Sequence, residues 1–174
     1  MLETHRLMLR LLTEQDEHEV VAWRNQSDII NNLFSYKGLT INEHRQWYTN
    51  YLKDDTRIEF VITVKESEQK IGTIGLSSID YRNQIAEYGV LLGTKQERGK
   101  GYAQEASVAI LEYAFSELNL YKIKLKVFTD NMDAVKMYQK LGFVKEGTLR
   151  REVYKNGTFK DVTLMAILKD EWVN

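Results

Sequence analysis

The stretch that decides the fold reads GTKQERGKGYA over residues 93–103. It follows an apolar run typical of a strand, Ala86 to Leu92, and precedes a helical pattern from Tyr102 to Leu118. Gly99 and Gly101 let backbone N–H groups turn inward, and a helix that begins there adds free N–H groups and the positive end of its dipole. The stretch therefore predicts a binding site for a phosphate or pyrophosphate.

Two common phosphate-binding motifs do not fit this stretch. A P-loop has four residues between its first glycine and a Gly-Lys pair, with Ser or Thr next. Here five residues separate Gly93 from Gly99, and Gly101 stands at the hydroxyl position. A dinucleotide-binding turn needs a third glycine where this chain has Gln104. Three basic side chains add positive charge to the stretch: Lys95, Arg98 and Lys100.

The composition predicts one soluble globular domain over residues 1–174, since 43% of the residues are hydrophobic and 28% are charged. The net charge of −1 does not favour a nucleic-acid binder or a membrane-surface protein. The chain has no cysteine, so catalysis has to use oxygen or nitrogen groups. Without a signal-peptide pattern or a long apolar run, the sequence predicts a cytoplasmic protein.

The order of predicted elements is strand, two helices, three strands, helix, strand, helix and two strands. The predicted strands cover residues 7–12, 58–64, 71–79, 85–92, 123–128, 143–154 and 158–168, and the predicted helices cover 14–25, 43–53, 102–118 and 131–141. Residues 28–36 could form a helix or a loop. A meander before a βαβ-like half predicts an α+β domain on one mixed, mostly antiparallel sheet.

Local signals support several of these boundaries. Thr13 with Asp16 is a variant of the capping box, and Asn42 is a candidate cap for the second helix. Residues 58–64 alternate as in a half-buried strand. Asn156-Gly157 between alternating runs predicts a hairpin.

Two blocks of the sequence resemble the GNAT N-acetyltransferase superfamily. Gln96-x-x-Gly99-x-Gly101 is similar to its acetyl-CoA pyrophosphate loop, and residues 131–143 resemble its second CoA-contacting block. Residues 143–161 resemble the C-terminal hairpin of the ribosomal-protein and spermidine acetyltransferase branch. The resemblance covers nearly the whole chain. It implies acetyl transfer from acetyl-CoA to an amine, no metal, and a fold that often supports a homodimer.

The resemblance also implies how acetyl-CoA is held. Backbone groups of Leu91 and Leu92 would pair with the pantetheine arm, and Asn131 would contact it. Lys136 or Lys140 could reach a phosphate, and the alternative for each is a solvated lysine on a helix face. N–H groups of the glycine stretch would donate hydrogen bonds to the pyrophosphate. The cofactor-binding residues expected in this stretch are Gln96, Arg98, Gly99, Lys100, Gly101, Tyr102 and Ala103.

Two side chains are candidates for proton transfer. The resemblance makes Tyr138 the general acid for the leaving thiolate, and the alternative is a tyrosine packed on the core. An alkyl amine with a pKa of about 10.4 arrives protonated and needs a base. Glu87 is the candidate because it shares a strand face with Leu91, whose neighbourhood would supply a backbone N–H to the thioester oxygen. A solvent-facing Glu87 is the alternative, and His44 and Glu152 are weaker candidates for the base.

The acceptor site is expected between the first two helices and the C-terminal hairpin. Trp23, Arg24, His44 and Trp47 suit an anionic or planar acceptor and resemble nucleotide-linked amino-sugar N-acetyltransferases. Both tryptophans could instead be core residues. The C-terminal half resembles spermidine acetyltransferases better, but residues 34–42 contain no carboxylate.

Two further hypotheses remain open from the sequence. The acceptor could be a protein N-terminus, as in ribosomal-protein acetyltransferases. The chain could also be a non-catalytic CoA-binding sensor, in which case loss of Tyr138 would matter little. No nucleic-acid or membrane partner is expected.

Overall fold

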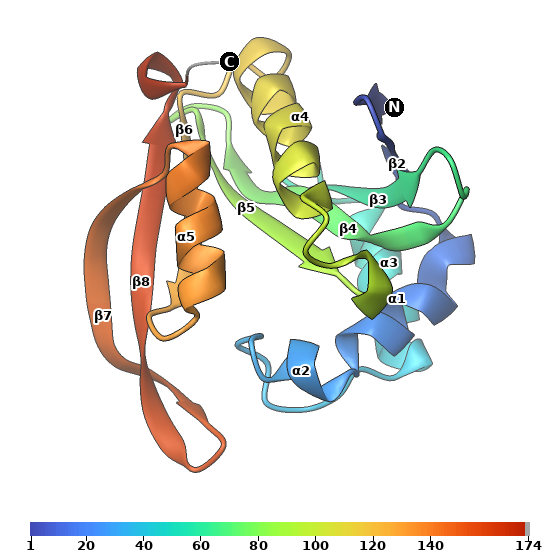
Figure 1. Ribbon diagram of the computed structural model, residues 1–174, viewed down its shortest axis with the longest axis horizontal. Coiled ribbons are helices and arrows are strands. Elements are labelled where there is room, and N and C mark those ends of the chain that lie inside the picture. The colour runs from blue at the N-terminus through green and yellow to red at the C-terminus, as the bar shows by residue number, and fades with distance from the viewer. Residues whose placement is uncertain (173–174) are drawn as a thin grey trace.

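The computed structural model describes residues 1–172 (Figure 1). The strands are β1 (Leu2–Glu3), β2 (Leu7–Leu11), β3 (Ile58–Val64), β4 (Lys70–Asp80), β5 (Ile85–Leu92), β6 (Lys122–Phe128), β7 (Val144–Lys155) and β8 (Thr158–Leu168). The α-helices are α1 (Glu17–Arg24), α2 (Ser27–Ile30), α3 (Ile41–Tyr51), α4 (Tyr102–Ser116) and α5 (Met132–Leu141). Three short 3-10 helices are η1 (Glu14–Asp16), η2 (Lys95–Glu97) and η3 (Lys169–Glu171).

All eight described strands join one sheet, in the order β1-β2-β3-β4-β5-β6-β8-β7. Neighbouring strands are antiparallel, except that β5 and β6 run parallel. The predicted α+β fold with one mixed, mostly antiparallel sheet is therefore confirmed. The hairpin turn between β7 and β8 has positive φ at both Asn156 (51°) and Gly157 (83°), as the Asn-Gly signal predicts.

Helices cover both faces of the sheet. The main core packs α4 and α5 against one face, and a second cluster packs α1 and α3 against the other (Figure 1). Phe60 and Ile62 of β3 belong to the first cluster and are 3% and 0% exposed, while Val61 belongs to the second and is 0% exposed. The prediction of a half-buried strand at 58–64 is therefore wrong, because helices cover β3 on both sides.

Several helix boundaries differ from the prediction. The first predicted helix is divided into η1 and α1, although the Thr13 N–H does donate to the Asp16 carboxylate (2.9 Å) as its capping signal predicts. Thr40, not Asn42, caps α3: its hydroxyl accepts from the Glu43 N–H at 3.1 Å, and its own N–H donates to the Glu43 carboxylate at 2.9 Å. The helix therefore starts at Ile41, two residues before the predicted start. Within residues 28–36 only a short helix, α2, forms, and α4 ends at Ser116 rather than Leu118.

Candidate active site

The site begins where β5 and β6 separate. The two strands pair only from Ile85 and Lys122 to Glu87 and Lys124. From Tyr88 onward the described pairing of β5 is with β4 alone. Leu91 and Leu92 therefore lie on a half-strand whose β6 side keeps an unpaired backbone edge, directly before the glycine loop (residues 93–103).

The glycine loop presents backbone rather than side-chain charge. Gly99 and Gly101 adopt left-handed φ values of 77° and 81°, and Gly101 is the residue that precedes the first turn of α4. A Cβ atom at Gly99 would meet nothing within 4 Å, so the space above the loop is open. The first N–H groups of α4, which include those of Tyr102 and Ala103, have no partner within the helix. The loop is thus shaped to bind an anion through N–H groups.

The basic side chains of the loop are mostly committed to ion pairs. The Arg98 guanidinium pairs with Asp28, and its Nε donates to the Leu92 carbonyl oxygen at 3.0 Å. Lys100 Nζ lies 2.9 Å from the Glu97 carboxylate. Arg98 therefore fastens the loop to β5 and α2 rather than lying free for a phosphate, while Gln96 is exposed.

The α5 residues lie on the other side of this opening. The Asn131 carboxamide oxygen caps α5 by accepting from the Ala134 N–H at 3.4 Å. Lys136 and Lys140 are both exposed on the helix surface. Either lysine is thus free to meet a phosphate or to stay solvated.

Tyr138 stands next to β5. Its ring packs edge-on against Tyr88 at 5.9 Å and against Phe143 at 5.9 Å. Burial raises the pKa of Tyr138 to about 12, so its hydroxyl stays protonated at neutral pH. Within residues 1–172 that hydroxyl has no hydrogen-bond partner, whereas the Tyr88 hydroxyl is paired with Ser107. Tyr138 is therefore an available proton donor.

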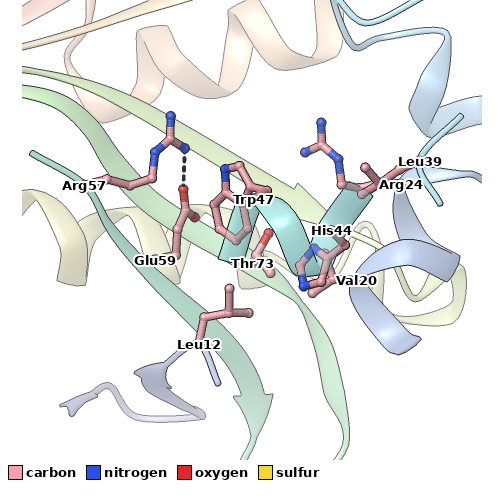
Figure 2. Close-up of a pocket in the computed structure, with 9 residues that line it drawn as sticks. All are labelled: Leu12, Val20, Arg24, Leu39, His44, Trp47, Arg57, Glu59 and Thr73. Atoms are coloured by element: carbon pink, nitrogen blue, oxygen red, sulfur yellow. Dashed lines mark hydrogen bonds and ion pairs between the residues drawn. The ribbon is translucent and has the colours of Figure 1, made fainter. Parts of the chain in front are cut away.

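A cavity of about 340 Å³ opens on the sheet face that α1 and α3 cover (Figure 2). We call it the Arg24 cavity. It is lined by Leu12, Val20, Arg24, Leu39, His44, Trp47, Arg57, Glu59 and Thr73. A second hollow, the Glu87 hollow, shares Arg24, Arg57, Glu59 and Thr73 with it and continues to Leu33, Gly75, Ser77, Glu87, Tyr88, Gly89, Val90 and Leu91. The two spaces together lead from the helices to the strand that enters the glycine loop.

Strand register explains how the floor of these spaces forms. Glu59 pairs with Gly75, and Gly75 pairs with Gly89 on the next strand. Residues in such a row project from the same face of the sheet. The Glu59 carboxylate lies over Gly75, where a Cβ atom would be 2.5 Å from Glu59 Oε2, whereas a Cβ atom at Gly89 would meet nothing within 4 Å. The floor is therefore open at Gly89. Ser77 and Glu87 form the next row.

The charged groups of the Arg24 cavity differ in whether they have an ion-pair partner. Arg57 Nη1 lies 3.0 Å from Glu59 Oε1, and the Arg57 guanidinium lies 5.9 Å from the centre of the Trp47 ring. Burial raises the pKa of Glu59, and the nearby Arg57 opposes that rise. Burial lowers the pKa of Arg24, which nevertheless remains charged at neutral pH. Figure 2 shows the guanidinium groups of Arg24 and Arg57 on the two sides of Trp47, extending in the same direction.

His44 is buried, at 2% exposure, and stacks on Trp47 with ring centres 5.5 Å apart. Its Nε2 has no hydrogen-bond partner among the described residues. Burial lowers the pKa of His44, so the ring is neutral near pH 7.

Most predicted acceptor residues meet in this cavity, and one does not. Arg24, His44 and Trp47 line it, but Trp23 is 7% exposed and packs in the core. A Cβ atom at Gly93 would lie 1.9 Å from Trp23 Cγ, so the indole supports the start of the glycine loop. Trp23 is thus too deeply packed to stack on an acceptor, as the core alternative for the tryptophans predicts.

Among the candidate bases, Glu87 lies in the hollow beside Leu91, as the shared strand face predicts. Glu152 is exposed on β7 and lines a separate surface hollow with Arg150, Arg151 and Asp161. Arg57 and Glu59 were not predicted from the sequence as site residues. The sequence signal for Glu59 is a carboxylate near the start of the otherwise apolar strand β3, on the same side as Val61.

The described residues hold neither a metal-binding cluster nor a membrane-spanning helix. Within residues 1–172, no group of three or more His, Asp or Glu side chains is arranged to hold a metal ion. No described helix is long and apolar enough to cross a membrane.

Residues 6–144 match the acetyltransferase (GNAT) domain family. The chain belongs to this family and is an N-acetyltransferase. It is 33% identical over 170 residues to spermidine N(1)-acetyltransferase of Vibrio cholerae, which covers 97% of this chain and 96% of that protein. It is 31% identical over 172 residues to an uncharacterised N-acetyltransferase of Bacillus subtilis, covering 97% of this chain and 96% of that protein.

A solved structure shows the same fold. The crystal structure of spermidine N-acetyltransferase from Vibrio cholerae in complex with CoA and spermine superposes with a TM-score of 0.92 and 31% identity. The match covers 98% of this chain and 100% of the other. The family, the α+β fold and the acetyltransferase activity predicted from the glycine stretch and the 131–143 block are therefore confirmed.

Proposed function

We propose that this chain transfers the acetyl group of acetyl-CoA to a primary amine of a small molecule, with both substrates bound at once. The observation that carries the proposal is the convergence of three features at one end of β5. The glycine loop follows this strand, Tyr138 packs against its Tyr88, and the Glu87 hollow opens beside its Leu91. Acetyl-CoA supplies an acetyl thioester, and the protein supplies binding groups and proton transfer.

The cofactor would be held by backbone groups. The N–H groups from residue 98 to residue 103 fit the pyrophosphate, because two left-handed glycines open the turn and the end of α4 adds its dipole. The unpaired edge of Leu91 and Leu92 fits the amides of the pantetheine arm. Asn131 and Lys140 complete the proposed cofactor site.

Proton transfer would use two side chains. Glu87 would accept the proton that the amine must lose, because it lies in the hollow through which an acceptor reaches Leu91. Tyr138 would donate its hydroxyl proton to the departing thiolate. A backbone N–H near Leu91 would stabilise the charge that develops on the thioester oxygen.

Two acceptor classes fit this proposal. The spermidine N-acetyltransferases among the relatives favour a polyamine. Arg24 in the cavity wall favours an amine that carries negative charge, such as a nucleotide-linked amino-sugar.

Initial velocities test the reaction itself. CoA release would be followed with a thiol reporter, which meets no protein background because the chain has no cysteine. Varying acetyl-CoA and the amine should give intersecting double-reciprocal lines. Glu87→Gln should lower kcat/KM roughly 10²- to 10⁴-fold, while the matched control Glu152→Gln should leave it unchanged. Parallel lines, or equal effects of the two variants, would contradict the proposed mechanism.

A further inference from the structure

Arg24 is the unexplained charge of the site. Its side chain is half-buried, lines both the Arg24 cavity and the Glu87 hollow, and also lines a third hollow with Ser35, Lys37 and Glu43. Within residues 1–172 it forms no hydrogen bond or ion pair, and only the more distant charges of Glu59 and Arg57 act on it. A partly desolvated guanidinium without a partner is costly, so it points to a ligand that supplies one.

The other charges around these spaces are largely matched inside the protein. Glu59 is paired with Arg57 at 3.0 Å, and Glu43 is paired with Lys37 at 2.5 Å. Glu87 has no described ion pair. The walls therefore leave one unmatched cation, Arg24, and one unmatched carboxylate, Glu87, which line the same hollow.

A polycationic acceptor does not fit walls that leave only one carboxylate unpaired. A polyamine needs several free carboxylates, and each further carboxylate here already has a cationic partner. Gly89 leaves open space in the floor but adds no charge. An amine with an anionic group elsewhere in the same molecule would match both unpaired charges.

Resting on the proposed transferase function, we propose that the acceptor is a primary amine that also carries a carboxylate or phosphate, with Arg24 as its anion-binding residue. The amine would lie toward Glu87 and Leu91, where acetyl transfer takes place. The anionic group would lie toward α1, where a guanidinium binds carboxylate or phosphate in bidentate geometry.

The test is a calorimetric titration in the presence of CoA, paired with initial rates of acetyl transfer. The probes are a UDP-linked amino-sugar for phosphate, 4-aminobutyrate for carboxylate, the free amino-sugar without its nucleotide, and spermidine. Arg24→Gln removes the charge, and Arg45→Gln is the matched control. Arg45 pairs with Glu17 at 2.7 Å and lines a different hollow.

One of the two anionic probes should bind at least tenfold more tightly than its uncharged counterpart or spermidine. Arg24→Gln should weaken that binding roughly 10- to 100-fold, the range for hydrogen bonds to a charged group. It should raise the KM for that acceptor while the KM for acetyl-CoA stays unchanged. Arg45→Gln should behave as wild type. The anionic probe that binds more tightly shows whether the anionic group of the acceptor is a phosphate or a carboxylate.

Two outcomes separate this inference from the function on which it rests. If spermidine is acetylated and binds most tightly, with Arg24→Gln neutral or beneficial, the anionic acceptor is wrong although the transferase stands. If an anionic amine binds through Arg24 but is never acetylated, the binding site stands and the proposed reaction fails.

Discussion

The glycine loop follows β5, and the Arg24 cavity lies on the sheet face that α1 and α3 cover, but the two regions are built differently. The loop is eleven consecutive residues whose function depends on backbone shape, with Gly99 and Gly101 at φ values of 77° and 81°. The cavity joins side chains from α1, α3, β3, β4 and adjoining segments, and its lining residues Leu12 and Thr73 are 61 positions apart in the sequence. The function of the loop therefore depends on its backbone conformation, while the shape and charge of the cavity can be altered by replacing single side chains.

The same contrast holds for charge. In the loop, nearby partners neutralise the side-chain charges, as in the pair of Lys100 with Glu97. The backbone N–H groups are therefore the groups that are free to bind an anion. In the cavity, Arg24 is left unmatched. We infer that the loop sets which cosubstrate is used and the cavity sets which amine is acetylated, and the following predictions test that division in order of expected effect.

The largest effect is expected at Tyr138, on the cosubstrate side. Tyr138→Phe removes the proton donor and should lower kcat roughly 10²- to 10⁴-fold. Calorimetry should find unchanged affinities for CoA and for the acceptor, because the hydroxyl makes no other described contact. A variant with wild-type kcat would remove Tyr138 from the mechanism and favour the non-catalytic role of a packed tyrosine.

The next effect is expected at Asp16, which supports the acceptor side. Asp16 is 0% exposed, accepts from Arg10 at 2.6 Å and from the Thr13 N–H at 2.9 Å, and pairs with Lys70 at 2.9 Å. Asp16→Asn should therefore lower the free energy of unfolding by about 3–5 kcal/mol at pH 7, the range for a broken buried ion pair. Urea unfolding measures this loss.

The pH dependence of that loss follows from the pKa of Asp16. Burial alone would raise that pKa, but the partners Arg10, Thr13 and Lys70 together hold it well below its usual range. Its stabilisation is thus complete above the unfolded pKa of about 3.9 and is lost as pH falls further. The difference between wild type and Asp16→Asn should shrink below pH 4. A difference that stays constant from pH 7 to pH 3 would contradict the ion-pair explanation.

A smaller effect is expected in the glycine loop. Gly101→Ala places a Cβ atom on a left-handed residue, which costs roughly 1–2 kcal/mol. The loop should respond by losing its shape, so CoA binding should weaken roughly tenfold while acceptor binding is retained. Gly147→Ala on β7 is the control, since a Cβ atom there meets nothing within 4 Å. Equal CoA affinity in Gly101→Ala and wild type would show that the turn does not depend on this conformation.

The smallest effect is expected at the cap of α3. Thr40→Ala removes the hydroxyl that accepts from the Glu43 N–H and should cost about 1 kcal/mol of stability. Because α3 carries His44 and Trp47 into the cavity, the acceptor KM should rise slightly and the KM for acetyl-CoA should not. Asn42→Ala, at the cap expected from sequence, should have no such effect on stability.

The sequence predicted the backbone around the glycine stretch well because neighbouring residues specify it. Strand 85–92, the helix that follows the glycine stretch and the helix that begins at about residue 131 all form as expected. The parallel pairing of β5 with β6 joins residues 85–87 to residues 122–124, so no local sequence pattern specifies it.

The acceptor side was predicted less completely because its geometry depends on distant contacts. Arg24 and Trp23 are adjacent in sequence, yet one lines the cavity and the other packs against Gly93. No local pattern tells them apart. The pairing of Glu59 with Gly75, and of Gly75 with Gly89, likewise depends on strand register, which the sequence alone leaves undetermined.

The most direct test of direct acetyl transfer is a single turnover followed by mass spectrometry. The enzyme, in excess over acetyl-CoA, would be sampled with and without an accepted amine. We predict that without amine the acetyl group stays on CoA and the protein mass is unchanged, and that with amine the acetyl group moves to it as CoA is released. CoA release without amine, with an acetyl group left on the protein, would contradict transfer between two substrates bound together.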